Sequence, residues 1–477
     1  MSVATSRLVA QCRRIHPVKI LVLGYLSYLL VGWALLCVPA MQDAPGGLSA
    51  LDNLFTATSA MSTTGLITVD QPRVYSFWGE LVILLLIQLG GLGYMTFGSF
   101  VVLAGRPRLS EWREGMTRTA FVMPAGFRPA AFIRSVVLFT LAVEVVGAAL
   151  LFWAFSSAGV AERAALTGDA DIGASFSGWA HVAWQSVFHS ISAFCTAGFS
   201  LFPDSLAAYR DNPWINMITS ALSLFGAIGF IVMADVFWTL TGRRRHLTLT
   251  TKVILKFTFW ILVLGTALLF LAEPALRDLP AESRLMAAFF QAMTAATTVG
   301  FNTVDIGALS AASVLLMYGL MIIGASPSGT GGGLKSTSLS AIFATVRSTL
   351  RGQHEVHFAG RLIPRDRLHT AYAALGFYVF TLAVGGYLLL LTESRPDAIR
   401  ADAVRPLQDL LFEAASALGT VGISRGVTGE LSDLGKWVII GLMFIGRVGP
   451  LTFGLALFAG APVAAGAADE KEEDIAV

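Results

Sequence analysis

Long apolar stretches alternate with short polar segments along the whole chain. A helix needs about 20 apolar residues to cross a hydrocarbon core roughly 30 Å thick. Stretches of that length predict full membrane spans at 18–40, 80–103, 131–155, 213–240, 253–272, 312–345, 370–392 and 435–459. Between these spans lie apolar segments that are too short to cross. The pattern therefore predicts an all-α membrane protein with eight transmembrane helices and several shorter helices.

The composition agrees with this prediction. Hydrophobic residues make up 55% of the 477 residues and charged residues only 13%, against roughly 25% charged residues in an average soluble domain. A water-soluble fold could not bury so much apolar surface, so the lipid bilayer is the expected surrounding. The net charge of +2 indicates no particular partner, and no nucleic acid is expected. The three cysteines are too scattered to predict a metal cluster or a disulfide framework.

The distribution of basic residues predicts the orientation in the membrane. Arginine and lysine gather near the amino end and in loops at about 106–128, 243–252 and 347–367. Such loops are typically cytoplasmic. We therefore expect a multi-pass protein of the cell membrane with both termini in the cytoplasm, comprising an amino-terminal segment at 1–16 and an acidic tail at 461–477.

An eleven-residue pattern, F-x-x-x-[ST]-A-x-x-T-x-G, occurs four times without insertions. The copies are Phe55–Gly65, Phe188–Gly198, Phe290–Gly300 and Phe412–Gly422. A large apolar residue follows the glycine in every copy, namely Leu66, Phe199, Phe301 and Ile423. Small residues are common in membrane helices, but a chance match of the glycine column alone has a probability of about one in a thousand. The repetition therefore indicates a fold built from repeated units.

Each copy stands between an apolar span that precedes it and a second span that follows it. The unit is a span, a short pore helix, a loop and another span. Four such units predict pseudo-symmetric repeats around one central ion pore, with four reentrant half-helices in addition to the eight spans. The expected repeat boundaries are 17–105, 106–240, 241–345 and 346–460.

The helical part of each copy is too short to cross the bilayer. It has about a dozen residues, and at 1.5 Å per residue it reaches roughly 18 Å. Its last carbonyl groups then lie at membrane depth, where irregular backbone is tolerated only beside protein or a water-filled cavity. The carboxyl end of a half-helix also carries the negative pole of the helix dipole. Four such ends aimed at one axis favour a cation there.

The T-x-G segment after each half-helix is predicted to bind the ion. Backbone carbonyl groups can replace the hydration shell of potassium, and glycine readily adopts the positive φ that turns successive carbonyl groups toward a pore. The predicted ion-binding residues are Thr63, Thr64, Gly65, Thr196, Ala197, Gly198, Thr298, Val299, Gly300, Thr420, Val421 and Gly422. Beyond the glycines, Asp70, Asp204 and Asp305 would either make the outer mouth negative or cap exposed turns.

The fourfold filter pattern resembles the Trk/Ktr/HKT superfamily of potassium transporters, and the short amino end is similar to the KtrB branch. The resemblance extends from about Pro17 to Gly460. It implies potassium uptake, a homodimer, and a separate cytosolic ring of nucleotide-binding regulatory subunits. Some HKT members admit sodium and carry serine in place of the first filter glycine. Gly65 is intact here, so potassium is the expected ion, and sodium or mixed transport is the alternative.

A break is predicted inside the second span of the third repeat, because its glycines and proline do not suit a continuous helix. The resemblance implies an intramembrane loop below the filter that obstructs the pore until the protein is activated. Arg447, deep in the last span, would contact this loop, or would only tie helices together. The predicted gate residues are Gly324, Ser326, Pro327, Ser328, Gly329, Thr330, Gly331, Gly332, Gly333, Lys335 and Arg447.

Two alternatives to transport are an ATP-hydrolysing enzyme and a purely structural membrane scaffold. The run from Gly329 to Ser336 is similar to a phosphate-binding loop, G-x-x-x-x-G-K-[ST], but Leu334 stands before Lys335 where that loop requires glycine. An ATP-hydrolysing enzyme is therefore not expected. A purely structural membrane scaffold would predict that substitution of Gly300 by serine leaves ion uptake unchanged.

Overall fold

The computed structural model describes residues 17–44, 47–93, 129–158, 176–327, 329–353, 355–358, 361–394 and 407–458. In these ranges the chain is helical apart from loops and one antiparallel hairpin, in which β1 (His357–Phe358) pairs with β2 (Arg361–Leu362). The predicted segment 1–16, the acidic tail at 461–477, the end of the predicted span 80–103 and the gate residue Ser328 lie outside the described residues.

The helices follow the same order four times along the chain. The first helices of each group are α2 (Pro17–Leu36), α8 (Pro129–Ser156), α13 (Leu249–Ala272) and α17 (Arg365–Glu393). Next come helices with buried carboxyl-terminal halves, α3 (Ala50–Ser62), α10 (Phe176–Phe194), α14 (Ala281–Thr297) and α19 (Leu407–Gly419). The third helices are α5 (Phe77–Leu92), α11 (Pro213–Ile228), α15 (Ala311–Ile323) and α20 (Asp433–Val448). We call the second set the half-helices.

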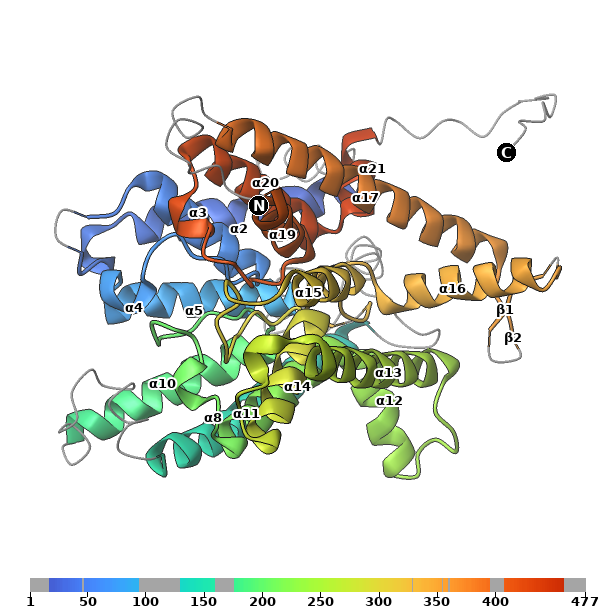
Figure 1. Cartoon of the computed structure of the whole chain (residues 1–477), viewed down its shortest axis with the longest axis horizontal. Coiled ribbons are helices and arrows are strands. Elements are labelled where there is room, and N and C mark those ends of the chain that lie inside the picture. Colours follow the sequence, from blue (N-terminus) through green and yellow to red (C-terminus); the bar gives the residue numbers. More distant parts are fainter. Residues whose placement is uncertain are drawn as a thin grey trace, which may run out of the picture.

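The third helix of each group packs against the half-helix of the next group. The pairs are α5 with α10, α11 with α14, α15 with α19, and α20 with α3. The last pair closes the circle, and Figure 1 shows α2, α3 and α5 beside α19 and α20. The first and last parts of the described chain therefore lie together, and the half-helices occupy the interior.

The remaining elements are short connections and extensions. They are α4 (Gln71–Val74), α12 (Phe230–Leu240), α16 (Ser336–Leu350), α21 (Pro450–Phe458) and the 3₁₀ turns η1 (Pro39–Met41), η3 (Ala207–Tyr209), η4 (Pro274–Leu276) and η5 (Thr428–Glu430).

Helix length and composition indicate which helices could cross a membrane. Within the described ranges, the helices that are long and apolar enough are Arg134–Ser156, Leu249–Ala272 and Arg367–Glu393, and two bent helix pairs would raise the total to five. Within the same ranges, shorter apolar helices of 10–17 residues are Val22–Leu36, Phe77–Leu92 and Ala311–Ile323. The several apolar helices fit a membrane protein, whereas the exact count of eight spans stays a prediction.

Two predicted spans are not continuous helices, and this corrects the sequence analysis. The span predicted at 213–240 bends by 102° between α11 and α12, and the span predicted at 435–459 bends by 97° between α20 and α21. The break predicted in the third group, between α15 and α16, is present. Each of the third helices ends at a glycine with positive φ, namely Gly93, Gly229, Gly324 and Gly449. Because glycine adopts this conformation without steric cost, the chain can turn sharply there.

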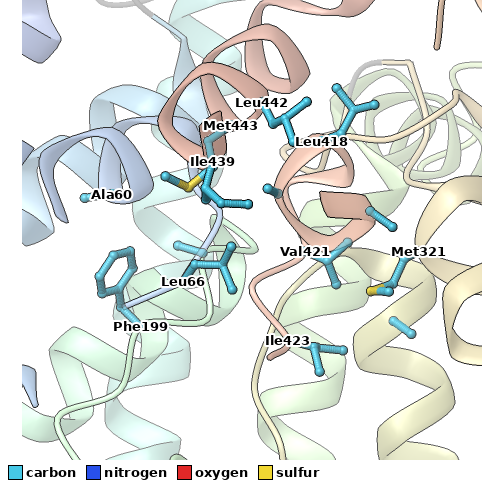
Figure 2. Packing of buried hydrophobic residues seen from close by; sticks show 14 of the residues in the cluster. Ala60, Leu66, Phe199, Met321, Leu418, Val421, Ile423, Ile439, Leu442 and Met443 are labelled. Atoms are coloured by element: carbon cyan, nitrogen blue, oxygen red, sulfur yellow. The ribbon is translucent and has the colours of Figure 1, made fainter. Parts of the chain in front are cut away.

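The buried core surrounds the ends of the half-helices. The apolar residues that follow the four template glycines, Leu66, Phe199, Phe301 and Ile423, are at most 2% exposed. Figure 2 shows Leu66, Phe199 and Ile423 among buried side chains of α3, α19 and α20. The large apolar residue that follows the glycine of each copy therefore anchors the loop after each half-helix in the core.

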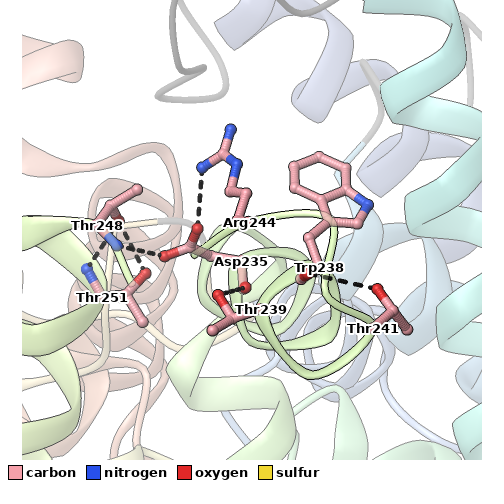
Figure 3. Close-up of polar contacts among 7 residues, drawn as sticks. All are labelled: Asp235, Trp238, Thr239, Thr241, Arg244, Thr248 and Thr251. Carbon is pink, nitrogen blue, oxygen red and sulfur yellow. Dashed lines mark hydrogen bonds and ion pairs between the residues drawn. The ribbon is translucent and has the colours of Figure 1, made fainter. Parts of the chain in front are cut away.

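A polar cluster holds the turn between α12 and α13. Asp235, which is 2% exposed, accepts hydrogen bonds from Arg244 Nη1 at 2.9 Å and from the Thr248 amide at 2.8 Å (Figure 3). The Arg244 guanidinium also lies over the Trp238 ring, 5.1 Å from its centroid. These contacts fix the direction of α12 after the bend at Gly229.

Substitution Asp235→Ala is expected to lower the temperature of thermal unfolding, because it leaves the Thr248 amide without its buried acceptor at a cost of about 1–3 kcal/mol. Asp211→Ala is the matched control, since that carboxylate is 54% exposed in its pair with Arg210 and exposed pairs contribute about 0–1 kcal/mol. Thermal unfolding of the two variants in detergent is the measurement. Equal shifts would contradict the role assigned to Asp235.

Candidate ion-conduction site

The four T-x-G segments lie together in a closed ring. A side chain on Gly65 would overlap the carbonyl oxygen of Ala197, and each following segment repeats this relation. The further pairs are Gly198 with Val299, Gly300 with Val421, and Gly422 with Thr64. Each glycine thus faces the carbonyl group of the middle residue in the next segment, and the fourth segment closes on the first. The predicted filter residues, which are far apart in sequence, are therefore brought to one place.

The backbone adopts one conformation in all four segments. Every threonine of the T-x-G pattern has a φ between 49° and 58°, and every glycine a φ between 66° and 94°. A positive φ is unusual for a β-branched residue, and such outliers cluster at functional sites. From the sequence, a positive φ was expected only for the glycines. Because the four threonines all have the same unusual positive φ, we infer that the surrounding structure imposes this backbone conformation on each segment.

The amide groups of the T-x-G segments bond back to their own half-helices. The middle-residue amides donate to carbonyl groups five residues earlier, in the pairs Thr64 to Ser59, Ala197 to Ser192, Val299 to Thr294, and Val421 to Ser416, at 2.8–3.1 Å. The Gly65 amide donates to Ser59 Oγ at 3.0 Å, and the Gly422 amide to Ser416 Oγ at 3.1 Å. The Ser192 hydroxyl donates to the Phe199 carbonyl at 2.8 Å.

The hydroxyl bonds give the Ser/Thr column of the repeated pattern a role in three of the four segments, through Ser59, Ser192 and Ser416. The amides of these segments donate to the half-helices, so the carbonyl groups of the same segments are available to other partners. In the part of the chain that the structure describes, no carbonyl oxygen of the twelve T-x-G residues accepts a protein hydrogen bond. Buried carbonyl groups normally have a partner. A ring of unpartnered backbone oxygens is a site suited to a dehydrated cation.

A cavity of about 580 Å³ lies against the four template glycines and is lined by Asp204 and Asp305. Asp305 also accepts a hydrogen bond from the Gly307 amide at 2.8 Å, as expected of a residue that caps a turn. Asp70 does not line this cavity and pairs with Arg73 at 3.1 Å. Two of the three acidic residues that were predicted at the outer mouth therefore lie at this cavity.

The segment from Gly324 to Lys335 contacts the opposite ends of the T-x-G segments. The Gly332 amide donates to Thr298 Oγ1 at 3.2 Å, and Thr330 Oγ1 accepts from Thr196 Oγ1 at 3.1 Å. Side chains on Gly331 and Gly332 would overlap the hydroxyl groups of Thr298 and Thr420. The glycines of this segment thus permit its close approach to the ring. We call residues 324–335 the intramembrane loop.

The remainder of the intramembrane loop is held by α11 and by basic side chains. The amides of Ser326 and Thr330 donate to the carbonyl groups of Ala227 and Gly226 at 3.1 and 3.0 Å. Lys335 Nζ donates to the Gly331 carbonyl at 2.8 Å, within the loop. Arg447, in the last turn of α20, donates to the Thr330 carbonyl and to the Gly90 carbonyl of α5.

The predicted gate residues are therefore close to the predicted filter residues, apart from Ser328, which lies outside the described residues. Pro327 and Gly329 belong to the loop, and Gly329 packs so closely on α11 that a side chain would overlap the Ala227 carbonyl. Gly324 and Gly333 lie back to back where the loop begins and ends, since a Cβ atom on either would come within 2.6 Å of the other's Cα.

The chain matches the family described as "TrkH: Cation transport protein" over residues 38–462. The chain belongs to the TrkH family. The resemblance that the fourfold pattern indicated is thereby confirmed.

Two curated relatives of this TrkH family chain extend the comparison. "Ktr system potassium uptake protein B" of Bacillus subtilis is 33% identical over 445 residues, which cover 92% of each chain. "Potassium/sodium uptake protein NtpJ" of Enterococcus hirae is 31% identical over 444 residues, again 92% of each.

A solved structure supports the fold of the TrkH family chain. The crystal structure of the potassium transporter TrkH from Vibrio parahaemolyticus superimposes with a TM-score of 0.64 at 19% sequence identity, covering 86% of this chain and 79% of that one. The predicted helical membrane fold is thus confirmed at the level of its overall arrangement. Membership of a family of ion transporters also agrees with the expectation that the chain is not an enzyme.

Proposed function

We propose that this chain carries potassium across the cell membrane through a filter formed by its four T-x-G segments. The observation that supports this most strongly is the closed ring of backbone carbonyl groups that lack protein partners. Such oxygens can replace water around potassium. The names of the curated relatives, which are potassium or potassium/sodium uptake proteins, favour the same ion class.

The proposed route begins at the cavity beside the glycines. Carboxylates of Asp204 and Asp305 would raise the local cation concentration there. The cation would then exchange water for carbonyl oxygens along the ring, where the carboxyl ends of the four half-helices add a favourable potential. The threonine residues at the far end of each segment complete the filter. Four pseudo-symmetric repeats, with the boundaries given above, would supply one segment each.

The proposed gate is the intramembrane loop. It packs directly against Thr196, Thr298 and Thr420 at the inner end of the ring, so an ion that leaves the filter would meet it first. Lys335 and Arg447 bring positive charge to the same place, and positive charge opposes the passage of a cation. Uptake would require the loop to move away from the ring.

The chain would work as a homodimer with a separate cytosolic ring of nucleotide-binding regulatory subunits. The relatives named as parts of a Ktr system support a multi-component transporter. Both termini would be cytoplasmic, in keeping with the distribution of basic residues.

Sodium or mixed transport is the alternative, and the name of the Enterococcus hirae relative keeps it in view. Uptake of potassium and sodium into proteoliposomes that contain the purified chain separates the two. We expect potassium to enter in preference and sodium to compete weakly. Equal uptake of the two ions by the unmodified chain would contradict the proposal.

Substitution Gly65→Ser should shift this preference toward sodium. Gly65 has a φ of 94°, and a side chain there would overlap the Ala197 carbonyl, so serine would displace one carbonyl group of the ring. We expect the ratio of potassium to sodium uptake to fall about tenfold, which corresponds to about 1.4 kcal/mol. Gly376→Ser is the control, since a Cβ atom there meets nothing within 4 Å. An unchanged ratio in Gly65→Ser would contradict the role of the first segment.

A further inference from the structure

The second position of each repeated pattern carries a polar side chain that is buried behind the filter. These residues are Thr56, His189, Gln291 and Glu413, and none is more than 1% exposed. Buried polar groups in a membrane protein are costly unless they are hydrogen-bonded. Three of the four bond to a hydroxyl group that lies two or three residues beyond the template glycine of the same segment.

His189 makes this bond in the second segment as a single neutral tautomer. Its Nδ1 lies 2.7 Å from the Gln185 carbonyl, which can only accept, so Nδ1 carries the proton. In the neutral ring Nε2 then accepts from the Ser200 hydroxyl, which lies 3.0 Å away. The ring is stacked on Phe202 at 4.5 Å between centroids. The imidazole therefore holds Ser200 from a rigid position.

Different chemistry produces the same bond in the third and fourth segments. Gln291 Nε2 donates to Thr303 Oγ1 at 3.1 Å. Glu413 Oε2 accepts from Ser424 Oγ at 2.9 Å, and its Oε1 accepts from Thr428 Oγ1. An imidazole, an amide and a carboxylate thus each join a half-helix to the chain just outside the filter.

The first segment uses a residue one helical turn earlier. Thr56 makes no hydrogen bond to its own loop in the described residues. Instead Asp52 Oδ1 accepts from Thr68 Oγ1 at 2.9 Å, and the carboxylate is in turn paired with Lys436 of α20 at 2.7 Å. All four filter segments are therefore tied to their half-helices at the outer end. We call these four contacts the outer ties.

We propose that the residues of the outer ties, Asp52, His189, Gln291 and Glu413, are positioning residues that set the preference for potassium over sodium. The inference rests on the proposed function. At its inner end each segment follows directly from a half-helix, and the buried apolar residue after the glycine anchors it in the core. The chain just beyond that residue is joined to its own half-helix by the tie. A loosened segment can close around the smaller sodium ion, whereas a fixed ring keeps the spacing that suits potassium.

The test removes the ties from the loop side, because those hydroxyl groups lie outside the T-x-G residues. Ser200→Ala, Thr303→Val and the pair Ser424→Ala with Thr428→Val should each lower the ratio of potassium to sodium uptake by about tenfold. The apparent KM for potassium should rise, while the maximal rate of total cation uptake should change by less than about twofold. A merely structural role would lower protein yield and maximal rate without moving the ratio.

Two further variants distinguish the bond from general packing. Gln291→Glu should retain the preference for potassium, because a carboxylate can accept from the Thr303 hydroxyl as Glu413 does from Ser424. Gln291→Leu, of similar size, should lose it. Thr56→Val is the matched control at the same position of the pattern and should behave as the unmodified chain.

The outcomes separate this inference from the proposed function. If the unmodified chain prefers potassium and Ser200→Ala, Thr303→Val and Gln291→Leu prefer it equally as monodisperse proteins, the outer ties do not set selectivity and the inference is overturned. If the unmodified chain itself shows no preference, the proposed function fails and the inference fails with it.

Discussion

Gly300→Ser is expected to abolish the preference for potassium over sodium, with at least a tenfold loss in the uptake ratio, or about 1.4 kcal/mol. Gly300 has a φ of 91°, which serine adopts only with strain. Its new Cβ atom would also overlap the Val421 carbonyl oxygen and lie 3.3 Å from the Gly422 Cα atom. The third and fourth segments must then separate, and the ring loses its shape. Competition between sodium and potassium in proteoliposome uptake is the measurement.

Gly319→Ser provides the matched control for this prediction. Gly319 lies in α15 of the same group, and a Cβ atom there meets nothing within 4 Å. This variant should keep the uptake ratio of the unmodified chain. If Gly300→Ser also kept it, the third T-x-G segment would not select the ion, and the filter proposed here would be wrong.

The ring itself could be predicted because its signal repeats. One copy of T-x-G carries little information, but four copies within the same longer pattern predict that the same local structure forms at four places in the chain. The half-helices at Ala50–Ser62 and Leu407–Gly419 could be predicted for the same reason. The break at Gly324 was visible because several glycines and a proline occur together, and their combined helix propensity is very unfavourable.

The bends at Gly229 and Gly449 were not predicted. At the first, Gly226 and Gly229 lie three residues apart, and each glycine costs a helix only about 1 kcal/mol, so the sequence permits both a continuous and a bent helix. At the second, Pro450 follows Gly449 and favours the start of a new helix, a signal that was not used. The choice is made by tertiary contacts. Gly226 packs against the Phe194 carbonyl and Gly446 against the Leu418 carbonyl, which brings α11 and α20 to the ends of the half-helices before the chain turns.

Features that depend on contacts between residues far apart in sequence could not be predicted either. The positive φ of Thr63 and its three equivalents follows from how each half-helix ends against the ring, since threonine itself disfavours that conformation. The outer ties were missed because Thr56, His189, Gln291 and Glu413 share a position but no chemistry. Only the three-dimensional fold brings three of them into the same contact.

Arg447→Gln is expected to raise the uptake rate of the chain reconstituted without regulatory subunits by about 10- to 100-fold. Arg447 donates to the Thr330 carbonyl of the intramembrane loop and to the Gly90 carbonyl of α5. Hydrogen bonds from charged groups contribute about 1.5–3 kcal/mol each, and loss of that amount from the closed state shifts its population by one to two orders of magnitude. Removal of the charge also lowers the barrier to a cation that leaves the filter. Initial rates of potassium uptake into proteoliposomes are the measurement.

Arg210→Gln is the matched control, because Arg210 is paired with exposed Asp211 far from the loop in sequence, and its loss should leave the rate unchanged.

The sign of the change in the uptake rate of Arg447→Gln decides between the two roles considered for this residue. A faster rate with retained selectivity fits an arginine that holds the loop against the ring. A slower rate in a folded, monodisperse protein would show that Arg447 acts by tying α20 to α5, since the open state would then need the contact as much as the closed one. The intramembrane loop would in that case require another latch, and Lys335, which bonds only within the loop among the contacts described, could not supply it alone.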